Sequence, residues 1–171
     1  PYPDFNAKFY RSNDKVACIS KVTHEILQNV APDVESCYMP HAVHSDIFKP
    51  PSTPEERAKT KEVRDAILSK STVVNKNKKI FFWNNRNARR KQSGTIVWWI
   101  KEWLDKVGHD KATLLMHTDA RDQHGQDLPA IIQHLGIDDG QVLISTNKLP
   151  PEELANFYRA ADYTINISDA E

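Results

Sequence analysis

Few cysteines, no net charge and no long apolar run set the first limits on this sequence. Cys18 and Cys37 are too few for a disulfide framework, and each lies in an apolar stretch, which predicts two reduced structural thiols and a cytoplasmic protein. The 23 basic and 23 acidic residues cancel, so no overall field attracts nucleic acid or an anionic membrane. No run approaches the roughly 18–20 apolar residues of a membrane span, and Pro1–Asn6 lacks the features of a signal peptide.

The rest of the composition is typical of a folded, water-soluble domain. The 171 residues are 39% hydrophobic and 27% charged, which disfavours disordered and collagen-like classes. A domain of about 150 residues buries roughly 68–70% of its unfolded surface, so we expect a real core. The chain begins without Met and stops at Glu171 directly after an apolar run, and from this we expect a piece cut at both ends.

The first part of the chain predicts a strand and a helix followed by a connector. The apolar strand Val16–Ile19 precedes Ser20, a helix-capping residue, and then an apolar stripe at helical spacing. Ser36–Met39 has the pattern of a further short strand. Pro40–Pro54 is rich in proline and histidine, as connectors are, so we place a domain boundary near residue 50. The two expected parts are residues 1–50 and 51–171.

Beyond this boundary, helices alternate with short apolar strands. Thr53-Pro54-Glu55-Glu56 predicts a capped helix start that leads toward Ser69. A second helix is expected from apolar residues at helical spacing: Ile96, Trp99, Ile100, Trp103, Leu104 and Val107. Two more helices are expected over Leu128–Leu135 and Pro151–Ala161. The expected strands are Ile80–Trp83, Ala112–Met116, Val142–Ile144 and Tyr163–Ile167. This alternation predicts an α/β fold with a Rossmann-like, doubly wound parallel sheet covered on both faces.

The carboxyl ends of the strands are where such sheets bind ligands, and the strongest candidate follows Ile80–Trp83. There the basic stretch Asn84–Lys91 has no acidic residue and stands directly before a helix. As a phosphate cradle, Arg86 would make a two-pronged contact with phosphate oxygens, Lys91 would add a point charge, and helix N–H groups would assist. The alternative is a solvated basic loop. Its position between a strand and a helix favours the cradle.

Two more strand ends supply weaker candidates. His117 and Thr118 follow Ala112–Met116 and either line a pocket or simply finish their strand. Asn147 and Lys148 follow Val142–Ile144, in a loop whose backbone either hydrogen-bonds a nucleobase edge or has no ligand. The residues alone leave both alternatives open.

The last strand end and the histidines complete the search for reactive groups. Ser168 and Glu171 follow the final strand, where a carboxylate can bind sugar or ribose hydroxyls. The seven histidines are scattered apart from His41 and His44, which lie in the connector. Because metal sites need ligands of matched type and spacing, we expect no metal.

Taken together, these stretches resemble the retaining, nucleotide-sugar-dependent glycosyltransferases of group 1, which have two Rossmann-like lobes in the GT-B fold. Val16–Lys21 is similar to the closing strand and serine turn of the first lobe. Pro40–Pro50 is similar to the interlobe linker, with Ala42 for the usual Gly and His44 for the usual Asp.

The resemblance continues in the second part of the chain. The family's donor-phosphate motif has an Arg and, five residues later, a Lys, and Arg86 and Lys91 keep this spacing. Asn85 and Gln92 replace the motif's flanking glycines. Glu152–Asp162 is similar to the helix and strand that lead to a proline-serine-x-x-glutamate signature, which here is Ile167–Glu171.

The resemblance implies a function for each part. Residues 1–50 would be the tail of the first lobe and the linker, and residues 51–171 an incomplete nucleotide-sugar-binding lobe. The parent enzyme would be a hexosyltransferase that passes a sugar from a nucleotide-diphosphate donor to a glycan, lipid or protein acceptor with retention, and this piece would be inactive alone. Arg86 and Lys91 would stabilise the leaving diphosphate, Glu171 would position donor hydroxyls, and no metal or other cofactor would be needed. The expected donor-binding residues are Asn85, Arg86, Lys91, His117, Thr118, Asn147, Lys148, Ser168 and Glu171.

Other functions remain open at this stage. A sugar-nucleotide epimerase or a phosphorylase of the same fold would also use cations at a phosphate site, and a non-catalytic module would bind nucleotide without turnover. Nucleic-acid binding through Lys76–Lys91 is disfavoured, because Phe81–Trp83 are consecutive aromatics typical of a buried strand. An uncovered sheet edge is also expected to pair with a second copy.

Overall fold

Residues 4–73 and 75–169 are described by the computed structural model, and they divide between an N-terminal unit, Pro1–Ser45, and a C-terminal unit, Asp46–Glu171. The N-terminal unit contains α1 (Ala7–Tyr10), β1 (Lys15–Cys18), α2 (Lys21–Val30) and β2 (Glu35–Tyr38). The two strands pair in parallel. The Ser20 hydroxyl accepts the Thr23 N–H and caps α2, as predicted. Cys18 and Cys37 are both free thiols, also as predicted.

The C-terminal unit is built on a four-stranded parallel sheet in the order β5-β4-β3-β6. The strands are β3 (Lys79–Asn84), β4 (Ala112–His117), β5 (Val142–Ser145) and β6 (Tyr163–Thr164). The helices are α3 (Pro54–Leu68), α4 (Ser93–Val107), α5 (Leu128–His134) and α6 (Pro151–Ala160), with a 3₁₀ turn, η1, at Arg89–Lys91. The predicted Rossmann-like α/β fold is therefore confirmed.

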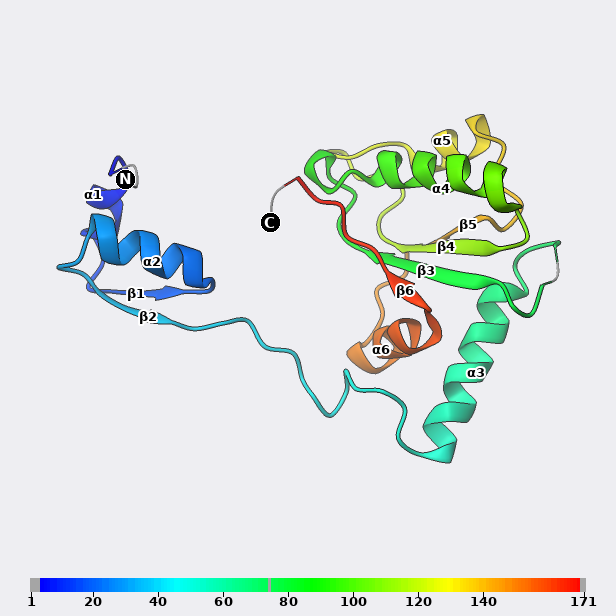
Figure 1. The fold of residues 1–171 in the computed structure, drawn as a ribbon, viewed down its shortest axis with the longest axis horizontal. Coiled ribbons are helices and arrows are strands. Elements are labelled where there is room, and N and C mark those ends of the chain that lie inside the picture. Colours follow the sequence, from blue (N-terminus) through cyan, green and yellow to red (C-terminus); the bar gives the residue numbers. More distant parts are fainter. Residues whose placement is uncertain (1–3, 74, 170–171) are drawn as a thin grey trace. The chain divides into compact units, whose positions relative to one another are not determined.

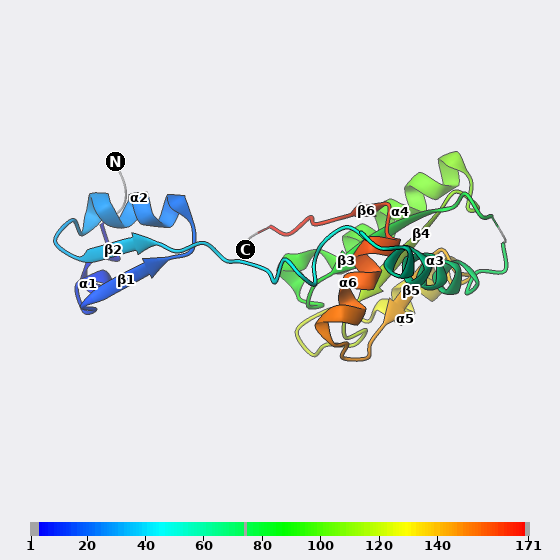
Figure 2. The ribbon, with the colours of Figure 1, turned by 90° about the horizontal axis from the view of Figure 1, so that it is seen from below.

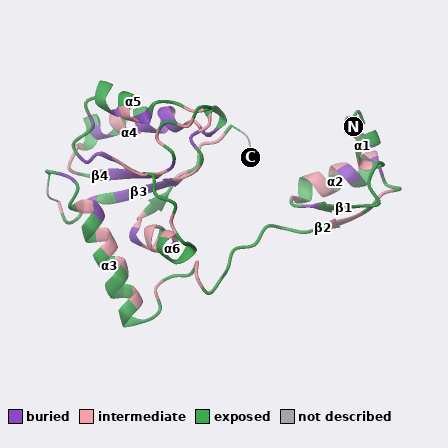
Figure 3. Ribbon diagram, turned by 180° about the vertical axis from the view of Figure 1, so that it is seen from behind, coloured by how far each residue is buried: buried purple, intermediate pink, exposed green. Residues whose placement is uncertain are grey.

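Helices cover both faces of this sheet. In Figure 1, α4 and α5 lie on one face, while α3 and α6 lie on the other, and the view in Figure 2 looks onto α3 and α6. Trp83, Leu114 and Met116 point into the core under α4 and α5, whereas Phe82 and Leu115 point into the core under α3 and α6. The buried residues accordingly concentrate in β3, β4 and the inner side of α4 (Figure 3). This two-sided burial is what the continuous apolar strands predicted.

The helix starts and stops follow from local chemistry. The Thr53 hydroxyl accepts the Glu56 N–H, and the Glu56 carboxylate accepts the Thr53 N–H, which completes the predicted capping box. Gly136 follows α5 with φ 64°, a left-handed conformation that suits glycine. Among the described helices, none is long and apolar enough to cross a membrane.

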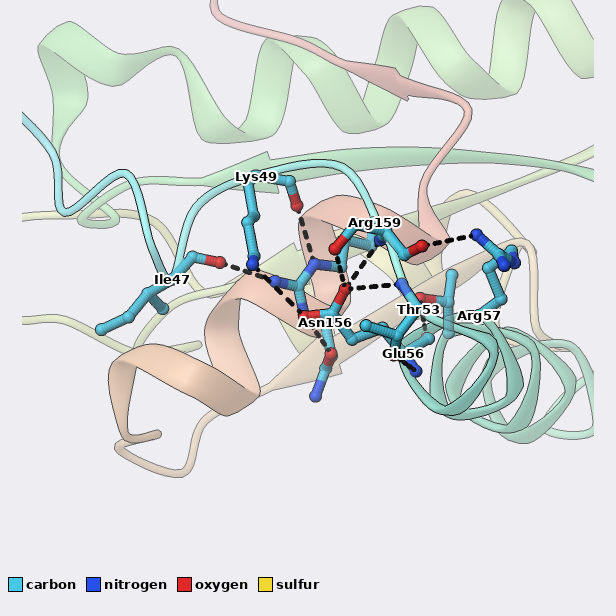
Figure 4. Close-up of polar contacts among 9 residues, drawn as sticks. Ile47, Lys49, Thr53, Glu56, Arg57, Asn156 and Arg159 are labelled. Carbon is cyan, nitrogen blue, oxygen red and sulfur yellow. Dashed lines mark hydrogen bonds and ion pairs between the residues drawn. The ribbon is translucent and has the colours of Figure 1, made fainter.

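The connector is fixed to α6 by Arg159. Its Nε donates to the Lys49 carbonyl at 2.9 Å and its Nη2 to the Ile47 carbonyl at 2.7 Å (Figure 4). The Phe48 ring packs edge-on against Tyr158, with ring centroids 6.1 Å apart. The segment around residue 50, where we expected a domain boundary, therefore packs onto the C-terminal unit.

The predicted apolar stripe of α4 was partly wrong. Its buried side is formed by Ile96, Val97, Ile100 and Leu104, whereas Trp99, Trp103 and Val107 are exposed. Trp99 and Trp103 lie to one side of the buried stripe, and Val107 is the last residue of the helix. Of the exposed residues, Trp103 packs edge-on against Phe81 at 5.7 Å.

The predicted last strand, Tyr163–Ile167, was too long. Pairing stops at Thr164, although the Ile165 N–H still donates to the Phe82 carbonyl at 2.9 Å. Two residues on, the Asn166 side chain accepts both the N–H and the hydroxyl of Ser168, at 3.2 and 2.7 Å. Such a local side-chain turn competes with the strand ladder and ends it.

The α4 packing can be tested by a pair of truncations. Leu104→Ala removes a fully buried side chain and should lower the free energy of unfolding by about 2–5 kcal/mol. Val107→Ala, at the exposed last residue of the helix, should cost less than about 1 kcal/mol. Urea unfolding followed by circular dichroism measures both, and equal losses would contradict the burial assigned to Leu104.

Candidate active site

The order of the strands creates a crevice beside β3. The chain adds β4 and then β5 on one side of β3 and returns to place β6 on the other side. At such a switch point the connections leave the two carboxyl ends in opposite directions, so the space between them stays open. The carboxyl ends of β3 and β6 are therefore where a ligand is expected.

A pocket of about 360 Å³ lies at this switch point. It is lined by Phe82, Asn84, Asn85, Tyr158, Thr164, Ile165 and Asn166. The Asn84 amide donates to the Tyr158 hydroxyl at 3.0 Å, and the Tyr158 ring packs edge-on against Phe82 at 4.8 Å. The lining thus combines uncharged amides and hydroxyls with an aromatic wall. Asn85 is the predicted site residue that lines this pocket directly.

Arg86 is the next residue in the chain, and its side chain is bound to Asp122. Nε donates to one carboxylate oxygen at 2.6 Å and Nη2 to the other at 3.1 Å. The bonds from Arg86, and then the bond from the His124 N–H, lower the pKa of Asp122 to about 2. The two-pronged contact that the sequence suggested for a phosphate is thus made here to a carboxylate.

The loop that carries Asp122 is joined to the basic turn by the buried Asn87 side chain. Its Nδ2 donates to the Gln126 carbonyl at 2.7 Å, and its Oδ1 accepts the Ser93 hydroxyl at 2.7 Å. Gln126 in turn accepts the Gly94 N–H at 2.6 Å, in the first turn of α4. That helix N–H, which we expected to face an anion, therefore bonds to a neutral amide within the protein.

Lys91 and the C-terminal segment approach the same turn. Lys91 is buried at the end of η1. The Asp169 N–H donates to the Arg90 carbonyl at 2.9 Å, and the Gln92 amide donates to the Asp169 carboxylate at 2.6 Å. The structure therefore brings Ser168 and its neighbour to the basic turn, while Glu171 lies outside the described residues.

Gln92 has a backbone conformation that glycine adopts most easily. Its φ is 57°, and it is the one non-glycine residue with a positive φ among residues 4–73 and 75–169. The resemblance to group 1 enzymes gives glycine at this position. The turn thus keeps the left-handed conformation without glycine, at some cost in backbone strain.

The other predicted residues lie at the ends of β4 and β5. Strand register places Asn84, His117 and Ser145 side by side, and His117 Nδ1 lies 3.0 Å from the Ser145 hydroxyl. Burial lowers the pKa of His117. Thr118 is buried, and its hydroxyl has no hydrogen-bond partner within the described part of the chain. Asn147 and Lys148 are exposed in the loop after β5.

Sequence reasoning missed several residues at this edge of the sheet. Asp122 was hidden because its partner lies 36 positions earlier, and Asn87 and Tyr158 sit within stretches read only for charge or for helical spacing. The available signal was position, since Asp119 and Asp122 follow β4 at the same edge. No group of three or more His, Cys, Asp or Glu side chains converges on a metal-sized site within the described ranges.

No family model matches this sequence, and no curated protein does either. Among solved structures, the chain is similar to a glycosyltransferase from Rickettsia africae ESF-5, with a TM-score of 0.64 and 22% identity over 97% of this chain and 42% of that one. It is also similar to the N-terminal domain of a trehalose-6-phosphate phosphatase from Candida albicans, with a TM-score of 0.66 and 12% identity over 95% of this chain and 43% of that one.

A third similar structure is the C-terminal domain of a group 1 glycosyl transferase, LpcC, from Francisella tularensis. The TM-score is 0.53 and the identity 17%, over 76% of this chain and 60% of that one. The chain spans about two fifths of the length of the first two structures. These likenesses show a Rossmann-like fold with GT-B glycosyltransferases among its structural neighbours.

The Arg86–Asp122 pair gives a prediction for acid titration. The folded pKa of Asp122 is about 2, against 3.8 for an ordinary aspartate. Because the folded pKa is depressed, the pair stabilises the fold fully above pH 3.8, and this contribution is lost as the pH falls toward 2.

Carboxyl NMR shifts followed over pH measure this pKa directly. Arg86→Ala should move the Asp122 midpoint up toward 3.8. The control is Arg11→Ala, which removes an arginine bound to Asp33 in the N-terminal unit and should leave the Asp122 midpoint in place. An Asp122 midpoint that does not change in Arg86→Ala would refute the pair.

Proposed function

We propose that the C-terminal unit binds a nucleotide-diphosphate sugar at the β3–β6 switch point, as the donor-binding lobe of a retaining GT-B glycosyltransferase that transfers a hexose. The observation that carries the proposal is an uncharged polar pocket at the switch point, followed in the chain by a turn that carries the exposed Arg86 and the buried Lys91. GT-B glycosyltransferases among the structural neighbours support the reaction class. Residues 1–50 would then be the end of the first lobe with its linker.

The pocket chemistry suits the neutral part of such a donor. Amide groups of Asn84, Asn85 and Asn166 can both donate to and accept from hydroxyl groups, as can Thr164 and Tyr158. A ribose or hexose ring offers many hydroxyls and no charge. A volume of about 360 Å³ is within the range of small-molecule sites.

The cations beside the pocket suit the diphosphate. Negative charge accumulates on the leaving diphosphate as the glycosidic bond breaks, so fixed cations stabilise the transition state more than the ground state. Arg86 and Lys91 are the proposed cations, and we propose no metal because the protein supplies this charge. Glu171 and Ser168 would position donor hydroxyls from the segment that follows β6.

The nucleobase would lie toward β4 and β5. Thr118 has a buried hydroxyl without a hydrogen-bond partner within the described residues, and burial lowers the pKa of the neighbouring His117. The exposed Asn147 and Lys148 would border this part of the site. We also propose that the protein works in the cytoplasm, where its two thiols stay reduced.

Catalysis is proposed for the whole protein. The chain spans about two fifths of its first structural neighbours, so the acceptor, whether glycan, lipid or protein, would bind outside it. For this chain alone we expect donor binding without turnover. Product analysis on the full-length protein separates sugar transfer from epimerisation or phosphorolysis.

Calorimetric titration with UDP, GDP and ADP and with their glucose and mannose conjugates tests the proposal. The wild type should prefer one base, and Arg86→Ala should weaken binding about 10- to 100-fold, the loss expected for a charge-assisted hydrogen bond. Arg11→Ala is the matched control, because it removes an arginine that is also bound to an aspartate through Nε and Nη2. Absence of binding to the whole panel, or an equal loss in the control, would reject the donor site.

A further inference from the structure

We propose that Asp122 is a positioning residue for the diphosphate: it holds the Arg86 guanidinium in the orientation that phosphate binding requires, without itself touching the ligand. This inference rests on the proposed function, because it assigns Arg86 to a phosphate. It adds a residue that the donor-phosphate motif does not contain, supplied by the loop between β4 and α5.

The geometry of the pair leaves the Arg86 guanidinium able to bind a second acceptor. Asp122 takes the Nε hydrogen and one Nη2 hydrogen of Arg86. A guanidinium has five N–H donors, so three remain for a second acceptor. The Arg86 side chain is 61% exposed, whereas that of Asp122 is only 11% exposed. The carboxylate is thus the less exposed partner, and the cation is the one that faces solvent.

Asp122 is fixed in place by its own loop. Its carboxylate also accepts the His124 N–H at 2.9 Å, and its carbonyl accepts the Gly125 N–H at 2.8 Å. Asn87 binds the same loop through the carbonyls of Ala120 and Gln126. To withdraw Asp122, the protein would have to break this part-buried network, so a fixed support fits the structure better than a movable gate.

Close packing also holds the loop against the basic turn. A Cβ built on Gly125 would lie 2.0 Å from the Asn87 carbonyl oxygen, a distance that no side chain tolerates. Gly125 therefore allows the backbones of the two loops to touch. Arg86 and Asp122 are carried by two segments that cannot shift independently.

Positioning has a measurable benefit. A free arginine loses rotamer freedom when it binds a phosphate, and a guanidinium already held by a carboxylate has lost it beforehand. We expect this to be worth about tenfold in the dissociation constant. Charge alone gives the opposite sign, since removing a carboxylate near a diphosphate should tighten binding. The direction of the change therefore separates the two effects.

The experiment is a calorimetric cycle on the full chain with Asp122→Asn, Arg86→Ala and the double variant. The probes are UDP, GDP and ADP, the corresponding nucleosides, and inorganic pyrophosphate. Asp122→Asn should weaken the binding of the nucleoside diphosphates and pyrophosphate about tenfold and leave nucleoside binding unchanged. In the Arg86→Ala background, Asp122→Asn should cause no further loss of affinity. Unchanged or tighter diphosphate binding, or an equal loss in the Arg86→Ala background, would overturn the proposal.

Two controls separate positioning from a general loss of structure. Asp33→Asn breaks the equivalent pair with Arg11 in the N-terminal unit and should leave all affinities unchanged. Asp122→Ser keeps a side-chain acceptor for the His124 N–H but loses the carboxylate, so it should show the same loss as Asp122→Asn. If it instead binds like the wild type, the effect of Asp122→Asn comes from the loop and the proposal fails.

The outcomes also distinguish this proposal from the proposed function. If pyrophosphate binds in an Arg86- and Asp122-dependent way but no nucleotide is preferred, the positioning role stands and the nucleotide-sugar assignment falls. If a nucleotide binds and Asp122→Asn has no effect, the nucleotide-sugar assignment stands and the positioning role falls. If the wild type binds none of the probes, both are rejected.

Discussion

Strand β3 lies between β4 and β6. The chain adds β4 and β5 on one side of β3 and then places β6 on its other side. The connection from β3 runs through α4 to β4, on the other side of β3 from β6, so it leaves the crevice between the carboxyl ends of β3 and β6 uncovered. The polar groups that line the pocket owe their place to this reversal: Asn84 ends β3 and Asn85 follows it, Asn166 follows β6, and Tyr158 belongs to α6. The apolar faces on either side supply the rigidity on which these groups depend.

Two kinds of polar surface meet at this edge, and they suit different parts of one ligand. The pocket itself carries amides and hydroxyls, whereas the turn that follows β3 carries a cation held by a carboxylate. Asp122 holds this cation in one orientation. The carboxylate also balances the charge of Arg86 when no ligand is present. The network around Asn87 ties the two loops together, so the support does not depend on the exposed ion pair alone.

Local chemistry made much of the fold predictable. The Thr53–Glu56 capping box, the Ser20 cap and the glycine after α5 are short-range signals, and each predicted its helix end correctly. Periodicity was less reliable where a face is only partly covered. It could not tell that Trp99 and Trp103 lie outside the buried side of α4, nor that Asn166 would end β6 through its own side chain.

The site was harder to predict than the fold. Position after a strand identified the basic turn, but it gave no information on what Arg86 would contact, since Asp122 comes from a loop 36 residues later. A bidentate contact depends on the three-dimensional approach of two loops, and that approach depends on Asn87 and Gly125, which carry no charge pattern. Charge counting alone therefore suggested a phosphate cradle or a solvated basic loop, and gave no sign of the contact with Asp122.

Backbone amide NMR of the chain during titration with UDP, GDP and ADP tests the central claim most directly. The account predicts that one nucleotide shifts the amides of residues 84–92 and 164–169, on either side of the switch point, and leaves the opposite edge of the sheet around Lys78 and Lys111 unchanged. Shifts confined to that opposite edge, or no shifts with any of the three nucleotides, would contradict it.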